Sequence, residues 1–227
     1  MKLEHISEDA LLITLASAID DALPGQISRM IAVLRSASPA WLTDLIPSYT
    51  TLLIVYDPVQ ASFRDVEAFL RKQLVDAGAG LNPSRPDSNR LIELPVYYSP
   101  ESGPDLEALA GYAGLDTESV IRMHSSREYR VHALGFAPGF AFMGQVDQAI
   151  ACPRKASPRK QVPAGSVGIA DRQTAVYPGE SPGGWQLIGR CPTRLFDAVN
   201  LSLLQVGDRV SFHSISRDEF LALGGIL

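Results

Sequence analysis

One short segment carries four cationic side chains. Arg154, Lys155, Arg159 and Lys160 lie within seven residues that contain no acid, and prolines limit the freedom of the segment. A guanidinium group can hold a carboxylate or phosphate through two parallel hydrogen bonds. The pattern therefore predicts an anion site at Arg154 and Arg159. The alternative is a basic loop that faces water.

Two glycine-rich turns follow this segment, at residues 163–166 and 182–185. Successive backbone N–H groups in such turns can point at an oxyanion or phosphate. The predicted anion-binding amides belong to Gly165, Ser166, Gly183 and Gly184. The alternative is that these glycines only turn the corners of a barrel. Neither turn has the GxxxxGK[ST] pattern of a P-loop, so an ATP site would be of another kind or on a partner chain.

Three further side chains are candidates for acid–base or substrate-holding roles. Gln173 and Tyr177 lie two residues either side of Ala175, so a strand would turn both to one face, where they could hold a polar substrate. His124 ends a predicted helix, and facing a cleft it could carry a proton. The alternatives are a core-edge histidine and a half-buried tyrosine.

Other chemistries find little support. The histidines are widely separated and form no HxxxH or HExxH pair, so no metal site is predicted. No serine has the GxSxG context of a hydrolase, and the two cysteines, Cys152 and Cys191, are expected to be free thiols.

The net charge of −5 is weak and argues against nucleic acid or an anionic membrane as a partner. No apolar run approaches the roughly 20 residues of a membrane span. Acids stand at residues 1–10, where a signal peptide would be basic, so a cytoplasmic protein is expected.

The elements that must position these residues fall into two groups. Residues 11–15, 41–46 and 51–56 predict strands, and apolar spacing predicts helices at 25–35 and from Ser62 to Gly78. A strand at 91–97 would complete a split βαβ, ferredoxin-like sandwich, unless it belongs to a second domain. The loop-like composition of residues 78–90 places the boundary there, giving an α+β domain at 1–88.

Residues 89–227 form the second predicted domain, which is mainly β. Short helices are expected at 104–113 and 117–124, and a strand at 129–134. Short apolar runs at 166–170, 174–177 and 185–188 predict strands of a barrel or sandwich, with Trp185 in its core. Ser216 and Glu219 predict a capped terminal helix.

Five motifs occur in order within this second domain: GFAPGFAFMG (135–144), PR (158–159), VPAGSVGIA (162–170), QTAVYP (173–178) and SPGGWQLIGR (181–190). Together they resemble the KipI or allophanate-hydrolase-subunit-1 family, which includes the B-type chain of bacterial 5-oxoprolinase. The resemblance implies a cyclophilin-like β-barrel after the α+β domain. It adds Arg190 to the anion-binding set and favours a site role for His124. Cys191 stands where the family more often has threonine.

The resemblance implies a subunit that is inactive alone. With C-type and A-type partner subunits it would open 5-oxoproline, a small anionic lactam, to glutamate at the expense of ATP with Mg²⁺. Phosphorylating the lactam oxygen would remove the amide resonance, and such chemistry needs anion clamps more than a nucleophile. Two other roles stay open: a regulatory protein that inhibits a sensor histidine kinase, and a carboxyltransferase-like subunit acting on urea- or allophanate-type amides.

Overall fold

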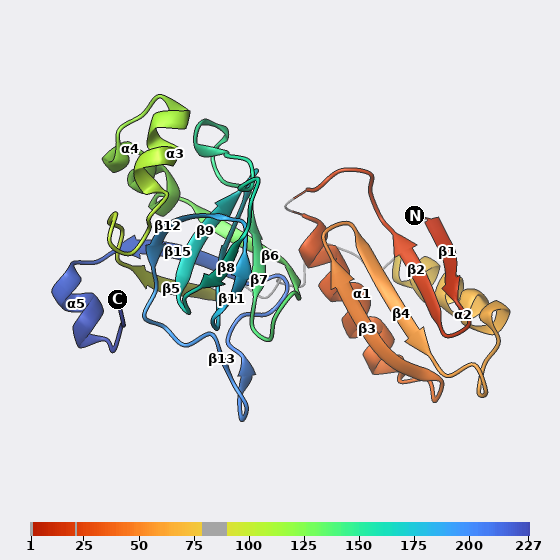
Figure 1. The fold of residues 1–227 in the computed structure, drawn as a ribbon. Helices are drawn as coiled ribbons and strands as arrows, with labels where there is room; N and C mark the ends of the chain where they lie inside the picture. Colours follow the sequence, from red (N-terminus) through yellow and green to blue (C-terminus); the bar gives the residue numbers. More distant parts are fainter. Residues whose placement is uncertain (1, 21, 79–89) are drawn as a thin grey trace. The chain divides into compact units, whose positions relative to one another are not determined.

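The computed structural model describes residues 2–20, 22–78 and 90–227. The chain divides into two compact units, Met1–Asn89 and Arg90–Leu227, and each has its own apolar core (Figure 1). The segment 81–89, where the sequence places the boundary, lies outside the described residues. None of the helices in the described ranges is both long and apolar enough to cross a membrane.

The first unit is a sheet covered on one face by two helices (Figure 1). Its elements are β1 (Lys2–Ser7), β2 (Ala10–Thr14), α1 (Leu23–Ala37), β3 (Leu42–Ser48), β4 (Thr51–Tyr56) and α2 (Phe63–Gly78). The strands run in the order β1-β2-β4-β3, and every neighbouring pair is antiparallel. Alternating residues of β2 and β4, such as Leu11, Ile13, Leu52 and Ile54, are fully buried against the helices.

One strand was not predicted from the sequence, and the place of another was left open. β1 was not predicted, because it is an edge strand whose residues are mostly exposed and show no clear apolar alternation. Strand β5 (Leu91–Val96), which could have completed the first sheet, instead pairs in parallel with β15 (Arg209–Ser214). It therefore belongs to the second unit.

The second unit is a barrel-like sheet with short helices. Its elements after β5 are α3 (Leu106–Ala113), α4 (Thr117–Ser125), β6 (Glu128–Leu134), β7 (Ala141–Gly144), the 3₁₀ turn η1 (Gln148–Ile150), β8 (Arg159–Val162), β9 (Ser166–Ala170), β10 (Gln173–Val176), β11 (Ser181–Gly183), β12 (Gln186–Arg190), β13 (Phe196–Asp197), β14 (Leu201–Ser202), β15 and α5 (Arg217–Ala222).

Within residues 90–227, seven strands form one sheet in the order β12-β9-β10-β7-β6-β15-β5. The two ends of this sheet meet, because Tyr97, just after β5, and Arg190, at the end of β12, exchange backbone hydrogen bonds of 2.9 Å in both directions. The sheet is therefore a nearly closed barrel. Helices α3 and α4 lie together at one end of it (Figure 1).

The last helix, α5, begins as the sequence predicts. The Ser216 hydroxyl accepts from the backbone N–H of Glu219, and the Glu219 carboxylate accepts from the backbone N–H of Ser216. This capping box satisfies N–H groups at the start of the helix. It fixes the segment that carries the fully buried ring of Phe220.

Candidate functional site

The basic segment meets an acid from a distant part of the chain. Asp105, directly before α3, accepts hydrogen bonds at Oδ1 from Arg159 (2.6 Å) and from Lys155 (2.9 Å). Its other oxygen, Oδ2, accepts from the backbone N–H of Leu187 at 2.7 Å. The carboxyl group is almost completely buried, so it is a structural anchor between α3, the basic segment and β12.

This arrangement corrects the prediction that Arg159 is an open anion clamp. Burial alone would raise the pKa of Asp105, but the hydrogen bonds from Arg159, Lys155 and Leu187 outweigh it and hold the pKa below its usual value. The carboxylate is therefore ionised at neutral pH and neutralises Arg159. The sequence did not reveal Asp105 as the partner of Arg159, because an aspartate directly before a helix normally caps that helix. The side chain of Asp105 makes no capping hydrogen bond.

Arg154, unlike Arg159, has no acidic partner among the described residues. Its side chain is exposed and forms no ion pair in the described part of the chain, and its guanidinium carbon lies 5.8 Å from the centre of the Trp185 ring. This geometry is a cation–π contact. Arg154 therefore keeps hydrogen-bond donors available for an anion.

Arg154 lines a cavity of about 120 Å³ whose walls are mostly aromatic. The lining residues are Phe136, Phe140, Phe142, Arg154, Tyr177, Gly183, Gly184 and Trp185. We call this the aromatic cavity. Its rings meet edge to face, with centroids 5.2 Å apart for Phe140 and Tyr177 and 5.7 Å apart for Phe140 and Trp185. Such packing is favourable and gives the cavity fixed walls.

Gly183 has to be a glycine because the ring of Tyr177 packs directly against it. A Cβ atom on Gly183 would lie 2.3 Å from the hydroxyl oxygen of Tyr177. Burial raises the pKa of Tyr177, so its phenol stays protonated at neutral pH and can donate a hydrogen bond. Phe136, Phe140 and Phe142 were not predicted as site residues. Their motif contributed only to the family resemblance, and nothing in its spacing indicates that these rings line a cavity.

A second, more open hollow of about 390 Å³ adjoins the aromatic cavity, and Arg154 lines both. The hollow is also lined by Tyr112, Cys152, Pro153, Lys155, Ala156, Ser157 and Gln186. Both cysteines of the chain are free and buried. Arg154 thus stands where an aromatic wall meets a wider opening.

The first glycine-rich turn does not form the predicted anion nest. The N–H of Gly165 donates to the carbonyl of Tyr177 at 2.7 Å, and the N–H of Ser166 donates to the carbonyl of Pro163 at 3.2 Å. Both amides are therefore used inside the barrel. Gly165 turns a barrel corner in a left-handed conformation (φ +78°), which was the alternative interpretation.

His124 lies in the barrel core and faces no cleft, which corrects the prediction for this residue. It is fully buried, its ring stacks on Phe212 with centroids 4.7 Å apart, and Tyr98 and Thr174 lie within hydrogen-bond distance of its two ring nitrogens. The Thr174 hydroxyl donates to the carbonyl of Gly168, so it must accept from Nε2–H of His124, and Nδ1 must accept from Tyr98. The imidazole is neutral, and burial lowers its pKa to about 3.

Gln173 and Tyr177 are not brought into one site. Tyr177 belongs with Ala175 to the aromatic cluster beside the cavity. Gln173 is half-buried at the start of β10, opposite Gly144 and Ala170, and it is not among the residues that line the cavities described here. Arg190 and Gly165 line a separate cavity of about 200 Å³ at the end of β12.

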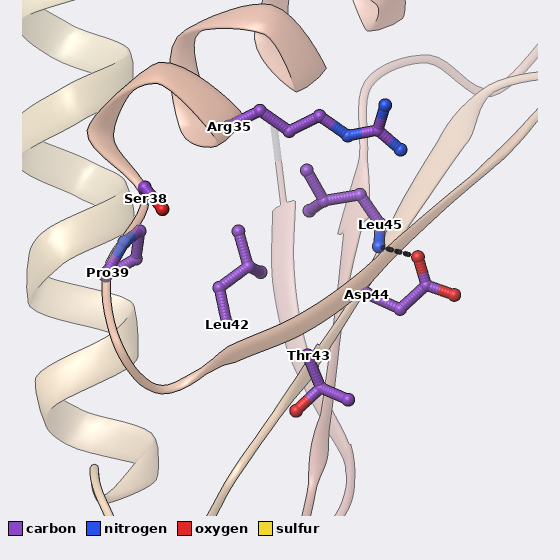
Figure 2. A pocket seen from close by; sticks show the side chains of 7 residues that line it. All are labelled: Arg35, Ser38, Pro39, Leu42, Thr43, Asp44 and Leu45. Atoms are coloured by element: carbon purple, nitrogen blue, oxygen red, sulfur yellow. Dashed lines mark hydrogen bonds between the residues drawn. The ribbon is translucent and has the colours of Figure 1, made fainter.

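The first unit has a hollow of its own, of about 220 Å³, between the end of α1 and the start of β3. Figure 2 shows the extended side chain of Arg35 on one side of it and the Asp44 carboxylate, which accepts from the backbone N–H of Leu45 at 2.7 Å, on the other. Arg35 and Asp44 are both exposed. The hollow therefore lacks the buried polar group that a specific ligand site uses.

No group of three histidine, cysteine or acidic side chains in residues 2–20, 22–78 and 90–227 is arranged to hold a metal ion. The Arg154 region, with its aromatic cavity and adjoining hollow, is thus the best candidate for ligand binding. It combines apolar walls, a cation and a phenol donor.

Residues 1–203 match the family described as the carboxyltransferase domain, subdomains C and D. The chain is 37% identical to the B-type chain of 5-oxoprolinase from Bacillus subtilis (strain 168), over 97% of this chain and 95% of that protein. It also resembles the crystal structure of TTHA0988, with a TM-score of 0.78 and 34% identity, over 91% of this chain and 40% of that one. It thus spans about two fifths of the length of that solved relative.

The urea amidolyase of K. lactis shares the fold, with a TM-score of 0.75 at 16% identity over 97% of this chain and 15% of that one. The matches to the family and to the B-type chain of 5-oxoprolinase each span most of the sequence, and they agree with the five ordered motifs of the second unit. The chain belongs to the carboxyltransferase subdomain C and D family, and within it to the KipI and allophanate-hydrolase-subunit-1 group that contains the B-type chain of 5-oxoprolinase.

Proposed function

We propose that this chain is the B-type component of an ATP-dependent 5-oxoprolinase and works with C-type and A-type subunits. The observation that carries the proposal is its similarity to the B-type chain of the Bacillus subtilis enzyme along nearly the full length of both proteins. The cyclophilin-like type of the barrel, which the same resemblance implies, and the split βαβ type of the first unit, which the sequence pattern predicts, stay predictions.

The aromatic cavity is the proposed place of the lactam. A five-membered lactam ring has two flat apolar faces, which suit the walls formed by Phe140 and Trp185. Its carboxylate would accept from the guanidinium of Arg154, and its carbonyl oxygen would accept from the phenol of Tyr177. A donor at that oxygen would engage one lone pair and leave the other directed at the phosphoryl group that the oxygen attacks.

The described residues do not fit ATP itself. The amides of Gly165 and Ser166 donate within the barrel, and Lys155 and Arg159 are engaged by Asp105, so among the described residues that line the aromatic cavity Arg154 is the one cation, which is too little charge for a triphosphate. We therefore assign ATP and its Mg²⁺ to a partner subunit. The role of this chain is to bind and orient the lactam.

The test is reconstitution. The chain is co-expressed with C-type and A-type partners, and 5-oxoproline-dependent ADP release is measured for wild type, Arg154→Gln and Tyr177→Phe. Loss of one charged hydrogen bond in a ligand site costs about 2 kcal/mol, or about 30-fold in kcat/KM. We expect a loss of that size for Arg154→Gln, with unchanged thermal unfolding because the side chain is exposed.

Lys160→Gln is the matched control. Lys160 is an exposed cation six residues from Arg154 and lines neither the aromatic cavity nor the adjoining hollow. Its loss should leave turnover unchanged. Equal turnover in wild type and both site variants would refute the placement of the lactam, and a wild-type complex that never couples ATP to 5-oxoproline would refute the function.

A regulatory protein that docks on a sensor histidine kinase is the second candidate. It is favoured by Phe136, whose ring is 65% exposed at the rim of the aromatic cavity, as an interface residue would be. The two functions separate in one experiment. Inhibition of kinase autophosphorylation by a chain that shows no ATP coupling with its partner subunits would favour regulation.

A further inference from the structure

Arg190, at the end of β12, carries a buried charge that no acid among the described residues balances. Arg190 is only 8% exposed and forms no ion pair within the described ranges. Its Nη1 donates to the carbonyl of Ile226 at 2.8 Å, while its Nε is buried without a hydrogen-bond partner among the described residues. An unmatched buried donor is costly, so this group needs a partner from outside the described residues, and a ligand is one such partner.

Arg190 lines a cavity of about 200 Å³ that contains a second cation, Arg194, and no acidic residue. Gly165 forms part of its wall. A Cβ atom at Gly165 would lie 3.2 Å from Cγ of Arg190 and 2.2 Å from the carbonyl oxygen of Cys191. Only a glycine lets the arginine stem lie this close to the backbone.

The cavity is covered by a short segment after α5. Gly224 turns the chain in a left-handed conformation (φ +83°), and this brings the carbonyl of Ile226 to Arg190. The side chain of Ile226 is 80% exposed, so the cover gains little from apolar burial. Its hydrogen bond to Arg190 is therefore a main contact that holds the segment over the cavity.

We propose that this cavity binds a small oxyanion, a phosphate or carboxylate group, through Arg190 and Arg194, and that the segment held by the Ile226 carbonyl competes with the oxyanion for access to Arg190. A guanidinium presents Nε–H and Nη2–H side by side, which matches two oxygens of one oxyanion, and Nη1, which donates to Ile226, is outside this pair. The carbonyl supplies only one oxygen and no charge. The site shares no lining residue with the aromatic cavity and does not depend on the proposed function.

Burial also lowers the pKa of Arg190, which reflects the desolvation of a charge that lacks a counter-ion. An oxyanion in the cavity would remove this penalty. Its binding should therefore be stronger than at an exposed arginine, whose charge water already stabilises.

The experiment follows the Nε–H signal of Arg190 by ¹⁵N NMR in the full chain, with Arg190→Gln used to assign it. Sodium phosphate and sodium acetate are the probes, and sodium chloride at equal ionic strength is the reference. A saturable shift with phosphate, with acetate or with both supports the site and tells which oxyanion it prefers. A shift that chloride reproduces, or none, overturns it.

Two variants test the competition without removing Arg190. A Cβ atom at Gly225 would lie 2.4 Å from the fully buried ring of Phe220, so Gly225→Ala has to displace the covering segment. Moving this segment away from Arg190 should tighten oxyanion binding about three- to tenfold. Arg194→Gln, at an exposed position, should weaken it by a similar factor.

Arg122→Gln is the control, since Arg122 is an exposed arginine on α4, does not line this cavity and carries the same charge. Binding should be unchanged in this variant. Equal affinities in wild type, Gly225→Ala and Arg194→Gln would overturn the proposal, because Arg190 would then only anchor the covering segment.

Discussion

His124 links the stability of the second unit to pH. In the folded chain burial lowers its pKa from 6.5 to about 3, and in the unfolded chain the ordinary value applies. Between pH 6.5 and pH 3, His124 therefore binds a proton in the unfolded state but not in the folded state. The stability that the neutral ring contributes is fully present above pH 6.5 and is lost progressively as the pH falls from 6.5 towards 3.

The size of the effect follows from these two values. Between pH 7 and pH 5 the free energy of unfolding should fall by about 2 kcal/mol through this single group, since each pH unit below the unfolded pKa costs about 1.4 kcal/mol. Most carboxylates titrate below this window, so their contribution is small in it. The perturbation is His124→Gln, whose amide can serve Tyr98 and Thr174 but does not titrate.

The assay is urea unfolding at pH 7, 6 and 5, followed by Trp185 fluorescence. The chain has two tryptophans, and Trp41→Phe in all samples leaves a signal from the second unit alone. His213→Gln removes an exposed histidine and should keep the wild-type acid loss. If wild type and His124→Gln lost equal stability between pH 7 and pH 5, His124 would not be the neutral core residue described here.

Three further changes test the packing of the barrel. Asp105→Asn leaves its two cationic partners without a counter-charge and should cost about 2–4 kcal/mol in urea unfolding, and Asp105→Glu should recover only part of it. Gly183→Ala forces a methyl group against the Tyr177 hydroxyl and should cost about 1–3 kcal/mol in the same assay; an unchanged midpoint would contradict the close contact. Cys191 is buried, and burial raises the pKa of its thiol, so an aromatic disulfide reagent should label it only as fast as the second unit unfolds, whereas Cys152 lines the open hollow and should be labelled sooner.

Local patterns predicted the elements well, because they depend on neighbours in the sequence. The Ser216 and Glu219 capping box, the helix at 117–125 and the strand at 166–170 all follow from spacing that the chain satisfies locally. The strand at 2–7 was not predicted, because an exposed edge strand needs no alternation of apolar residues. The place of the strand at 91–96 could not be decided locally, since its partner in the sheet lies at 209–214.

The candidate site was harder to predict because its chemistry depends on contacts that spacing cannot show. Arg154 and Arg159 are five residues apart and equivalent by type, and only the long-range partner Asp105 separates an engaged guanidinium from an available one. His124 shows the same limit. Its helix-terminal position is compatible with a cleft or a core, and Tyr98 and Thr174, which decide for the core, come from other elements.

The distribution of charge in the second unit gives a physical rule for ranking its cations. Where the fold uses a cation for structure, it supplies a buried acid, as Asp105 does for Arg159 and Asp208 does for Arg90. Arg190 is more buried than either of these arginines but has no such acid in the described part of the chain, and Arg154 keeps its donors free at the rim of an aromatic cavity. Since an unbalanced buried charge destabilises a fold, selection for stability alone would have removed it or paired it. The arginines without acids are therefore the ones whose counter-charge is expected to come from a ligand.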